Sequence, residues 1–210
     1  MQRFRMRYLP FISFFVILLS CSSAYKKMQK IPGDAGCVQK FKPQFQGAVY
    51  NTKVDVVGNH LSGLLVIKTM PDSSIRMVFS NQMGFKFFDF EFSRDSGFKV
   101  HYILKQMDKK AVITTLRKDF ELVLMYHTPI ADAYLLKNKT DFYYAFPQEK
   151  GINYYITDSA CTELKGLERA SKRKAVVQAI MLDYSNGLPD SIGITHKNFN
   201  FTIGLKLLKK

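Results

Sequence analysis

The sequence predicts a mainly β protein with minor α content, built on one antiparallel sheet. Three observations lead to this prediction. Short segments from residue 45 onward alternate apolar with polar residues, turn residues separate these segments, and one stretch changes to helical periodicity. No internal repeat or low-complexity segment interrupts the pattern. A sheet of ten or so strands can curve into a barrel or half-barrel with the helix as plug or lid, or it can stack as a sandwich. The pattern alone leaves these alternatives open.

The first twenty residues have the features of a secretory signal peptide. Three arginines in the first seven residues supply a positive start, and the apolar run Leu9–Leu19 follows. This run is shorter than the roughly 20 apolar residues that a membrane-spanning helix needs. The tetrapeptide Leu18-Leu19-Ser20-Cys21 resembles the bacterial lipobox. The resemblance implies cleavage before Cys21, a diacylglycerol thioether on its sulfur and acylation of its new amine, so residues 1–20 are expected to be a lipoprotein signal peptide.

Residues 21–44 follow the expected cleavage point and show little apolar periodicity. Several lysines and the pair Pro32-Gly33 predict a lipid-anchored tether that enters structure near Cys37. Cys37 and Cys161 are the other two cysteines, and the exported compartment is oxidising, so a disulfide between them is the simplest arrangement. Two separate buried thiols are the alternative. Neither cysteine has the spacing of a redox or zinc motif.

Residues 45–210 are predicted to form one domain whose first half consists of strands. The strand at 88–92 places Phe88, Phe90 and Phe92 on one face, so Asp89 and Glu91 are expected to face solvent. The other strands of this half, with the turn residues that follow them, are 54–56 before Gly58-Asn59, 61–68 before Pro71-Asp72-Ser73-Ser74, 75–80 before Asn81, and 98–104 after Asp95-Ser96-Gly97.

The periodicity changes to helical between residues 116 and 126. Leu116, Phe120, Val123 and Leu124 fall at i, i+4, i+7 and i+8, which predicts a short amphipathic helix. A second helical stretch is expected over 163–170. Strand patterns then return at 142–144, 152–156, 176–184, 192–196 and 199–207. The last of these is expected to close the core.

The chain is strongly basic, with a net charge of +14. Three of the positive charges lie in the signal peptide, which leaves +11 on the mature chain. Such a charge is compatible with nucleic acid, but an exported, lipid-tethered protein meets anionic lipid head groups and other envelope polyanions first, and we expect no nucleic-acid partner. The densest basic cluster contains Arg169, Lys172, Arg173 and Lys174 and is expected to be a solvated turn or helix end.

No pattern of catalytic residues is present in the sequence. The histidines, at positions 60, 101, 127 and 196, are scattered and lack metal-ligand spacing, and no nucleophile elbow, phosphate-binding glycine loop or dinucleotide fingerprint occurs. Asp119 lies in a Lys-Asp-Phe context on the predicted helix, where an exposed ion pair is the expected role. We therefore expect a non-enzymatic protein with no cofactor and no metal.

Two regions of the chain resemble the LolA/LolB family of lipoprotein carriers. The segment 76–84, Arg-Met-Val-Phe-Ser-Asn-Gln-Met-Gly, followed by Phe88-Asp89-Phe90-Glu91-Phe92, is similar to the central hairpin of LolB, the outer-membrane lipoprotein receptor. The segments 188–194 and 201–207 resemble the proline-containing turn and final strands of the same superfamily. The resemblance spans roughly residues 45–208. Unlike that family's pattern, this chain has no Trp, adds the Cys37/Cys161 pair and has a basic segment near Arg173.

The resemblance implies an antiparallel sheet curved into an unclosed half-barrel with a short helical lid or plug. Its apolar interior would accept the acyl chains of lipoproteins or other lipids. In LolB a loop between two early strands delivers cargo to the membrane, and the matching turn here begins at Thr69 with Met70 as the candidate membrane-contacting tip. The residues expected to contact a ligand are Phe88, Phe90, Phe92, Val100, Tyr102, Leu116 and Phe120.

These observations predict a lipoprotein of a Gram-negative envelope that binds lipid or acyl chains. Ser22 and Ser23 follow the anchor without an acidic residue, which favours the outer membrane with the protein facing the periplasm. The alternative is a structural or partner-binding lipoprotein whose interior is filled by its own side chains. An apolar void of about 300 Å³ or more is typical of ligand sites and would favour carriage. The ligand, any protein partner and the oligomeric state are not determined by the sequence.

Overall fold

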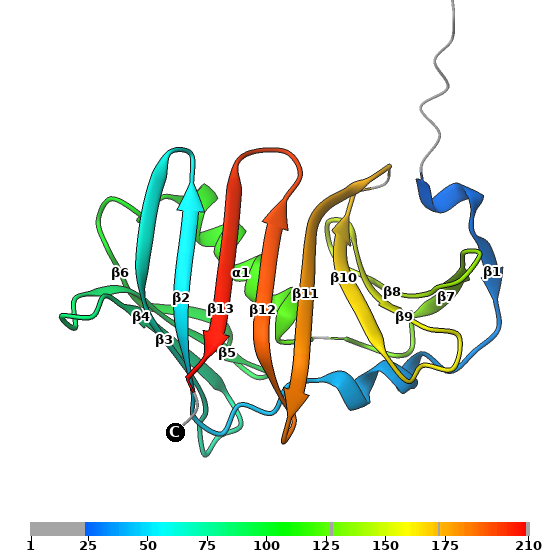
Figure 1. Cartoon of the computed structure of the whole chain (residues 1–210), viewed down its shortest axis with the longest axis horizontal. Coiled ribbons are helices and arrows are strands. Elements are labelled where there is room, and N and C mark those ends of the chain that lie inside the picture. The colour runs from blue at the N-terminus through cyan, green and yellow to red at the C-terminus, as the bar shows by residue number, and fades with distance from the viewer. Residues whose placement is uncertain (1–23, 127, 172, 209–210) are drawn as a thin grey trace, which may run out of the picture.

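One curved antiparallel sheet forms the frame of the molecule (Figure 1). The computed structural model describes residues 24–126, 128–171 and 173–208. The sheet has 13 strands in the order β1-β7-β8-β9-β10-β11-β12-β13-β2-β3-β4-β5-β6, and every neighbouring pair is antiparallel. Because β1 and β6 have no strand beyond them, the sheet is unclosed, and the predicted half-barrel is confirmed.

The elements follow one another along the chain as a series of hairpins interrupted by one α-helix. Their bounds are 3-10 helix η1 (Ala24–Lys27), β1 (Gln29–Ile31), 3-10 helix η2 (Ala35–Phe41), β2 (Ala48–Val56), β3 (Asn59–Thr69), β4 (Ile75–Ser80), β5 (Lys86–Ser93), β6 (Gly97–Ile103), α1 (Lys110–Val123), β7 (Tyr134–Lys137), β8 (Phe142–Pro147), β9 (Ile152–Thr157), β10 (Leu164–Ala170), β11 (Ala175–Ser185), β12 (Leu188–His196) and β13 (Phe201–Leu207).

The hairpins are tight because their turns contain residues that adopt positive φ. The β11–β12 turn is Asn186-Gly187 with φ of 51° and 75°, the pair that two-residue turns of the right twist favour. The β2–β3 turn is Val57-Gly58 with φ of 45° and 79°. A β-branched residue such as Val57 adopts this conformation at a cost. The register of each hairpin keeps one set of alternate residues on the concave face.

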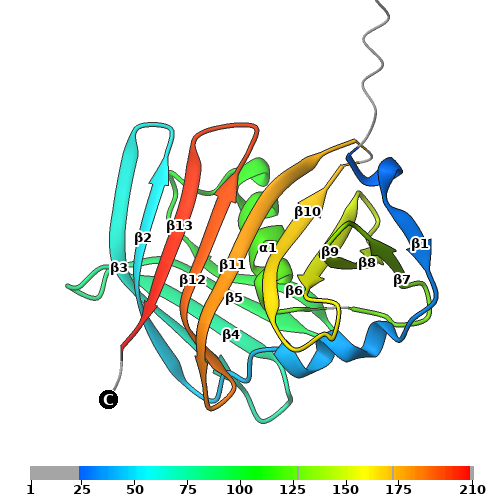
Figure 2. The ribbon, with the colours of Figure 1, turned by 45° about the vertical axis from the view of Figure 1, so that its right-hand side comes forward.

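Helix α1 lies in the trough of the curved sheet and packs against β10 and β11 (Figures 1 and 2). Its inward side chains join the aromatic residues of the sheet, and the Phe88 and Phe120 rings lie 5.7 Å apart. Phe88, Phe90 and Phe92 are at most 3% exposed. The predicted alternation of β5 is therefore confirmed for its apolar face, and this part of the half-barrel is filled by side chains.

Helix α1 begins six residues earlier than the start of the predicted helical stretch and ends at Val123. The pattern was ambiguous because residues 112–115 are Val-Ile-Thr-Thr, and β-branched residues favour strands. Residues 164–170, within the second predicted helix, form strand β10, which pairs with both β9 and β11. That prediction was wrong. Gly166 weakens a helix there, and Leu167 is buried opposite Tyr155 and Ala179.

The segment expected to be a tether is folded over its described part, from Ala24 onward. Strand β1 pairs with β7 at one edge of the sheet, and the rings of Tyr25 and Tyr154 stack with centroids 4.5 Å apart. The Tyr25 hydroxyl donates a hydrogen bond to Glu168 at 2.6 Å. Burial, reinforced by Glu168, raises the pKa of Tyr25 well above its usual value. This segment covers the outer face of β8–β10 with a second, smaller apolar cluster.

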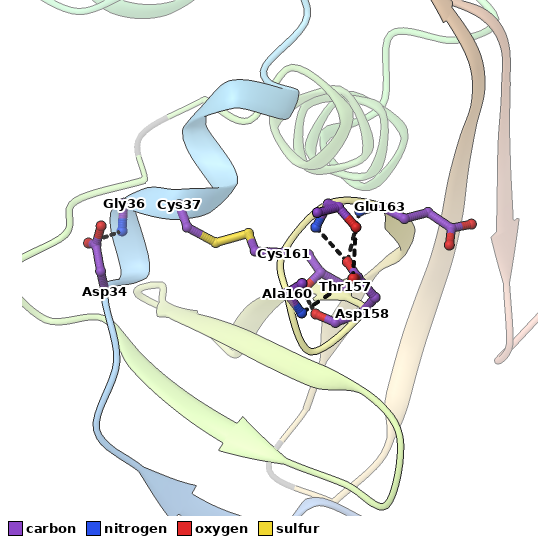
Figure 3. The surroundings of a disulfide bond; sticks show 9 residues. Asp34, Gly36, Cys37, Thr157, Asp158, Ala160, Cys161 and Glu163 are labelled. Carbon is purple, nitrogen blue, oxygen red and sulfur yellow. Dashed lines mark hydrogen bonds between the residues drawn. A yellow bond between two sulfur atoms is a disulfide. The ribbon is translucent and has the colours of Figure 1, made fainter.

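Cys37 and Cys161 form a disulfide that joins helix η2 to the β9–β10 turn (Figure 3). Their Cα atoms are 6.6 Å apart. The turn around Cys161 is organised by Asp158, whose carboxylate accepts hydrogen bonds from the backbone N–H groups of Ala160, Thr162 and Glu163. The bond from Glu163 contributes most to lowering the Asp158 pKa to about 2. The disulfide therefore fastens the N-terminal segment to a turn that is already ordered.

We predict that the double variant Cys37→Ser/Cys161→Ser retains the fold but loses about 2–5 kcal/mol of unfolding free energy, as removal of native disulfides usually does. Urea denaturation of the mature protein measures the loss. Treating the unmutated protein with reductant is the matched control and should shift the urea midpoint equally. Two free thiols in protein extracted from the envelope, found by peptide mass analysis, would contradict the assignment.

Candidate ligand-binding site

An apolar pocket of about 540 Å³ opens at one end of the trough, beside the N-terminal half of α1. We call it the apolar pocket. Its walls come from the β2–β3 hairpin, the loop between β6 and α1, the first turns of α1 and the β12–β13 turn with the start of β13. The lining residues are Val54, Val56, Val57, Asn59, Leu61, Leu104, Gln106, Met107, Ala111, Val112, Thr115, Leu116, Phe199 and Phe201.

The periodicities of helix and strand bring these side chains together. Ala111, Val112, Thr115 and Leu116 occupy positions i, i+1, i+4 and i+5 of α1, which form one face of a helix. In the sheet, Val56 pairs with Phe201 across β2 and β13, and Val54 pairs with Leu61 across β2 and β3. Asn59, Gln106 and Thr115 supply the only polar side chains of the described lining. The pocket therefore suits an uncharged, apolar group.

The rim of the apolar pocket exposes two large apolar side chains. Val57 is 69% exposed in the β2–β3 turn, and Phe199 is 45% exposed in the β12–β13 turn. Apolar residues at turns contribute little to folding when they remain exposed. Here two of them come from different hairpins and border the same pocket.

The predicted ligand-contacting residues do not all meet at this pocket. Leu116 lines it. Phe88, Phe90, Phe92 and Phe120 lie in the packed core.

Val100 is half-buried against the core, but Tyr102 does not face the interior as expected. Tyr102 is 41% exposed, and Lys86 Nζ lies 5.6 Å from the centre of its ring. The cause is a register shift between β5 and β6. No residue of β5 is opposite His101 in the strand pairing, so Tyr102 pairs with Asp89 and Ile103 with Phe88. An extra residue in one strand reverses the faces beyond it. No turn residue in the sequence marks this bulge.

Most of the pocket's lining was missed because each contributing segment is short. Gln106 and Met107 lie in a loop with no periodicity of its own, and Leu104, predicted as the end of a strand, belongs to the same loop because β6 ends at Ile103. The strand pattern at 199–207 did indicate an apolar face that closes the core, and Phe201 lies on it. The sequence did not show that the helix starts at Lys110, and this start places Ala111 and Val112 in the pocket lining.

Asp119 is fully buried, not in an exposed ion pair as predicted, and it holds α1 to the sheet. Its Oδ1 accepts a hydrogen bond from Arg169 Nη2 at 2.9 Å, and its Oδ2 lies 2.7 Å from His196 Nε2. Arg169 belongs to β10 and His196 is the last residue of β12. The sequence could not show this because the three residues are far apart in the chain, and because Asp and Arg are usually exposed.

The C-terminal end of α1 is tied to both arms of the sheet. The Tyr155 hydroxyl of β9 donates a hydrogen bond to the carbonyl oxygen of Leu122 at 3.3 Å. Just after the helix, the Tyr126 hydroxyl donates to the carbonyl oxygen of Ser93 in β5. Together with the Asp119 contacts, these bonds fix the helix across the trough as a lid.

Asp89 also departs from the prediction, since it is 5% exposed. Its two carboxylate oxygens accept hydrogen bonds from Arg76 at 2.8 and 3.1 Å, and Lys86 Nζ lies 3.5 Å away. Burial alone would raise the pKa of Asp89, but the hydrogen bonds and positive charges of Arg76 and Lys86 outweigh it and lower the pKa. Glu91 is half-buried beside His101, with 2.7 Å between Oε2 and Nε2. These contacts bind neighbouring strands together on the outer face.

Met70, the candidate membrane tip, lies in the β3–β4 turn and is half-buried. The next hairpin exposes more apolar surface, because Met83 is 84% and Phe85 69% exposed in the β4–β5 turn. The membrane role of Met70 stays a prediction. Cys21 and the signal peptide lie outside the described residues, as does Lys172 of the basic cluster.

No three or more His, Cys, Asp or Glu side chains in the described part of the chain are grouped so that they could hold a metal ion. None of the helices in that part is long and apolar enough to cross a membrane.

Comparison with solved structures relates the fold to known proteins. A LolA superfamily protein from Nitrosomonas europaea superposes with a TM-score of 0.51 at 6% identity, over 85% of this chain and 93% of that chain. A DUF1329 family protein from Desulfovibrio piger and an outer membrane lipoprotein-sorting protein domain from Vibrio parahaemolyticus each give a TM-score of 0.45 at 8% identity, over 83% and 84% of this chain and 88% and 90% of theirs. No family model and no curated protein matches the sequence. The likeness to the Nitrosomonas structure shows a shared LolA-like fold.

We predict that Asp119→Ala lowers the unfolding free energy by about 3–5 kcal/mol, because removing one partner leaves the buried Arg169 charge uncompensated. Urea denaturation followed by circular dichroism measures it. The matched control is Glu121→Ala, which removes the partner of Arg117 on the same helix and should cost about 1 kcal/mol or less, as pairs near the surface do. Equal losses in the two variants would show that the buried contacts do not fasten the lid.

Proposed function

We propose that this protein is a non-enzymatic lipoprotein of a Gram-negative envelope that binds acyl chains in the apolar pocket. The observation that carries the proposal is the pocket itself, which has a volume of about 540 Å³ and an almost wholly apolar lining. Ligand sites for small molecules typically have volumes of about 300–1,000 Å³ and a mostly apolar lining. Each methylene buried there contributes about 0.8 kcal/mol.

The location of the pocket supports an acyl chain as the occupant. A chain can enter past Val57 and Phe199, whose exposed side chains would contact it before it is enclosed. The LolA-like fold, found in a protein named for the LolA superfamily, supports the same class of ligand. The charge of the chain favours amphiphiles with anionic head groups over cationic ones.

A second candidate function has its own supporting observation. Phe88, Phe90, Phe92 and Phe120 fill the middle of the half-barrel, so the apolar pocket lies at one end of it. A lipoprotein that serves a protein partner, with a mostly filled interior, accounts for that packing. The apolar pocket favours acyl binding over this alternative, because a scaffold has no need for an open apolar pocket of this size.

We further propose that the protein is exported and anchored through an acylated Cys21 in the outer membrane, where it faces the periplasm. The arginine-rich start, the apolar run and the Leu-Leu-Ser-Cys tetrapeptide support this. The disulfide between Cys37 and Cys161 is consistent with an oxidising compartment.

We predict that a single tryptophan at the pocket's rim will report acyl binding, because the chain has no Trp of its own. In Gln106→Trp, whose exposed position lines the apolar pocket, titration with a dibrominated fatty acid should quench most of the indole emission and reach saturation. The matched control is Ser96→Trp in the β5–β6 turn, which lines none of the described pocket and should keep its emission. Quenching of neither variant, or equal quenching of both, would contradict acyl binding in this pocket.

We predict that Cys21→Ser abolishes incorporation of labelled fatty acid and leaves the protein unprocessed or soluble. Metabolic labelling followed by membrane fractionation measures both effects. The double variant Cys37→Ser/Cys161→Ser is the control and should remain labelled, because its cysteines lie in the folded domain. A Cys21→Ser protein that is still labelled and membrane-bound would rule out the anchor.

A further inference from the structure

A second pocket, of about 340 Å³, lies on the other side of α1 and has a different chemistry. We call it the polar pocket. It is bounded by α1, strand β6, the β8–β9 hairpin and strand β10, where the two arms of the sheet approach each other. The residues that carry its chemistry are Arg117, Lys118, Glu121, Glu149, Lys150, Asn153 and Arg169.

Two buried polar side-chain atoms of residues that line this pocket lack a hydrogen-bond partner among the described residues. They are Asn153 Oδ1 and Arg169 Nη1. Asn153 is 3% exposed and Arg169 9% exposed, and the two residues face each other across β9 and β10. Buried polar groups are almost always hydrogen-bonded, so an unpartnered pair in one pocket needs an explanation such as a bound polar group. Both side chains line the polar pocket.

The charges around these atoms favour an anion. Arg169 uses Nη2 for Asp119, and its Nη1 is buried without a hydrogen-bond partner among the described residues. Lys118 and Lys150 also line the pocket and, within the described residues, form no ion pair. Of the two acidic residues in the lining, Glu121 is bound by Arg117 at 2.7 Å. Glu149 is exposed in the β8–β9 turn.

The turn that contains Lys150 can approach β10 closely because its next residue, Gly151, has no side chain. Gly151 has φ of +97°, and a Cβ atom there would lie 2.4 Å from the carbonyl oxygen of Ala170. Only glycine fits such an approach. Lys150 and Asn153 therefore belong to one hairpin, β8–β9. Lys118 belongs to α1 and Arg169 to β10.

We propose that the polar pocket binds a phosphate group, as the free anion or as a monoester. Arg169 Nη1, the ammonium groups of Lys118 and Lys150, and the Asn153 amide nitrogen are its donors. The oxygen and nitrogen of an Asn amide exchange places by a rotation of the side chain, so the amide can turn its donor toward the anion. Four donors from three directions match a tetrahedral anion of charge near −2, whereas a planar carboxylate would use fewer of them.

This inference does not depend on acyl binding, because none of the residues that carry it lines the apolar pocket. Titration calorimetry of the mature protein with inorganic phosphate tests it directly. Lys118→Gln/Lys150→Gln should weaken the affinity at least about tenfold, because two charge-assisted contacts are lost. Lys68→Gln, on an exposed lysine of β3 outside this lining, is the matched control and should not change it.

If the double variant folds poorly, a second variant that is expected to raise the phosphate affinity still tests the proposal. Glu149→Gln removes an acidic group from the lining and should tighten phosphate binding.

A short-chain phosphatidic acid distinguishes the source of the group. Binding that is tighter than that of inorganic phosphate and that weakens in Lys118→Gln/Lys150→Gln identifies a lipid head group in this pocket, and equal binding of the two probes identifies phosphate itself as the sufficient ligand. The proposal would be overturned if neither probe binds, or if acetate and phosphate bind with equal affinity. It would also be overturned if Lys68→Gln lost as much phosphate affinity as Lys118→Gln/Lys150→Gln.

Discussion

An open curved sheet has a concave apolar face that must be covered, and in this protein one helix covers it. Because β1 and β6 do not pair, the trough cannot close on itself. Helix α1 therefore buries its apolar face against the sheet, and its exact position decides which parts of the trough are filled and which stay open. The Phe88 ring of β5 meets Phe120 in the last turn of the helix. Its first turns diverge from the β2–β3 hairpin and leave the apolar pocket.

The position of the helix is set by polar contacts in addition to apolar packing. Apolar contacts are non-directional, and the same leucines and phenylalanines would tolerate a helix shifted along the trough. A shift of the helix would break the contacts of Asp119, because its two carboxylate oxygens have partners on different strands. Buried charges of this kind add little net stability but penalise alternative arrangements. We regard these contacts as the element that determines where the lid lies.

The sequence predicted the class of the fold and most of its strands, because a period of two reports directly on a sheet with one buried face. The alternation in β5 located Phe88 and its neighbours on the core side. The Cys37–Cys161 pair was found because the cysteine count and the oxidising compartment indicate it, but three other features that depend on contacts between segments were missed. β10 has a helix-like composition but takes its conformation from β9 and β11. Tyr102 lies beyond a bulge that only pairing reveals, and Asp119 is buried by partners 50 and 77 residues away. The site was predicted only in part for the same reason, since its walls come from four short segments.

The helix also separates two chemical environments. One face of α1 carries Ala111, Val112 and Leu116 toward the apolar pocket, while Arg117, Lys118 and Glu121 line the polar pocket on another face. Such a division follows from the helical period, which places residues three or four apart on one face and their neighbours elsewhere. A lid fastened at Asp119 holds both pockets at once, so a movement of α1 that widened one pocket would also change the other. If the two proposed ligands bind, occupancy of one pocket is therefore expected to affect the other through the position of α1.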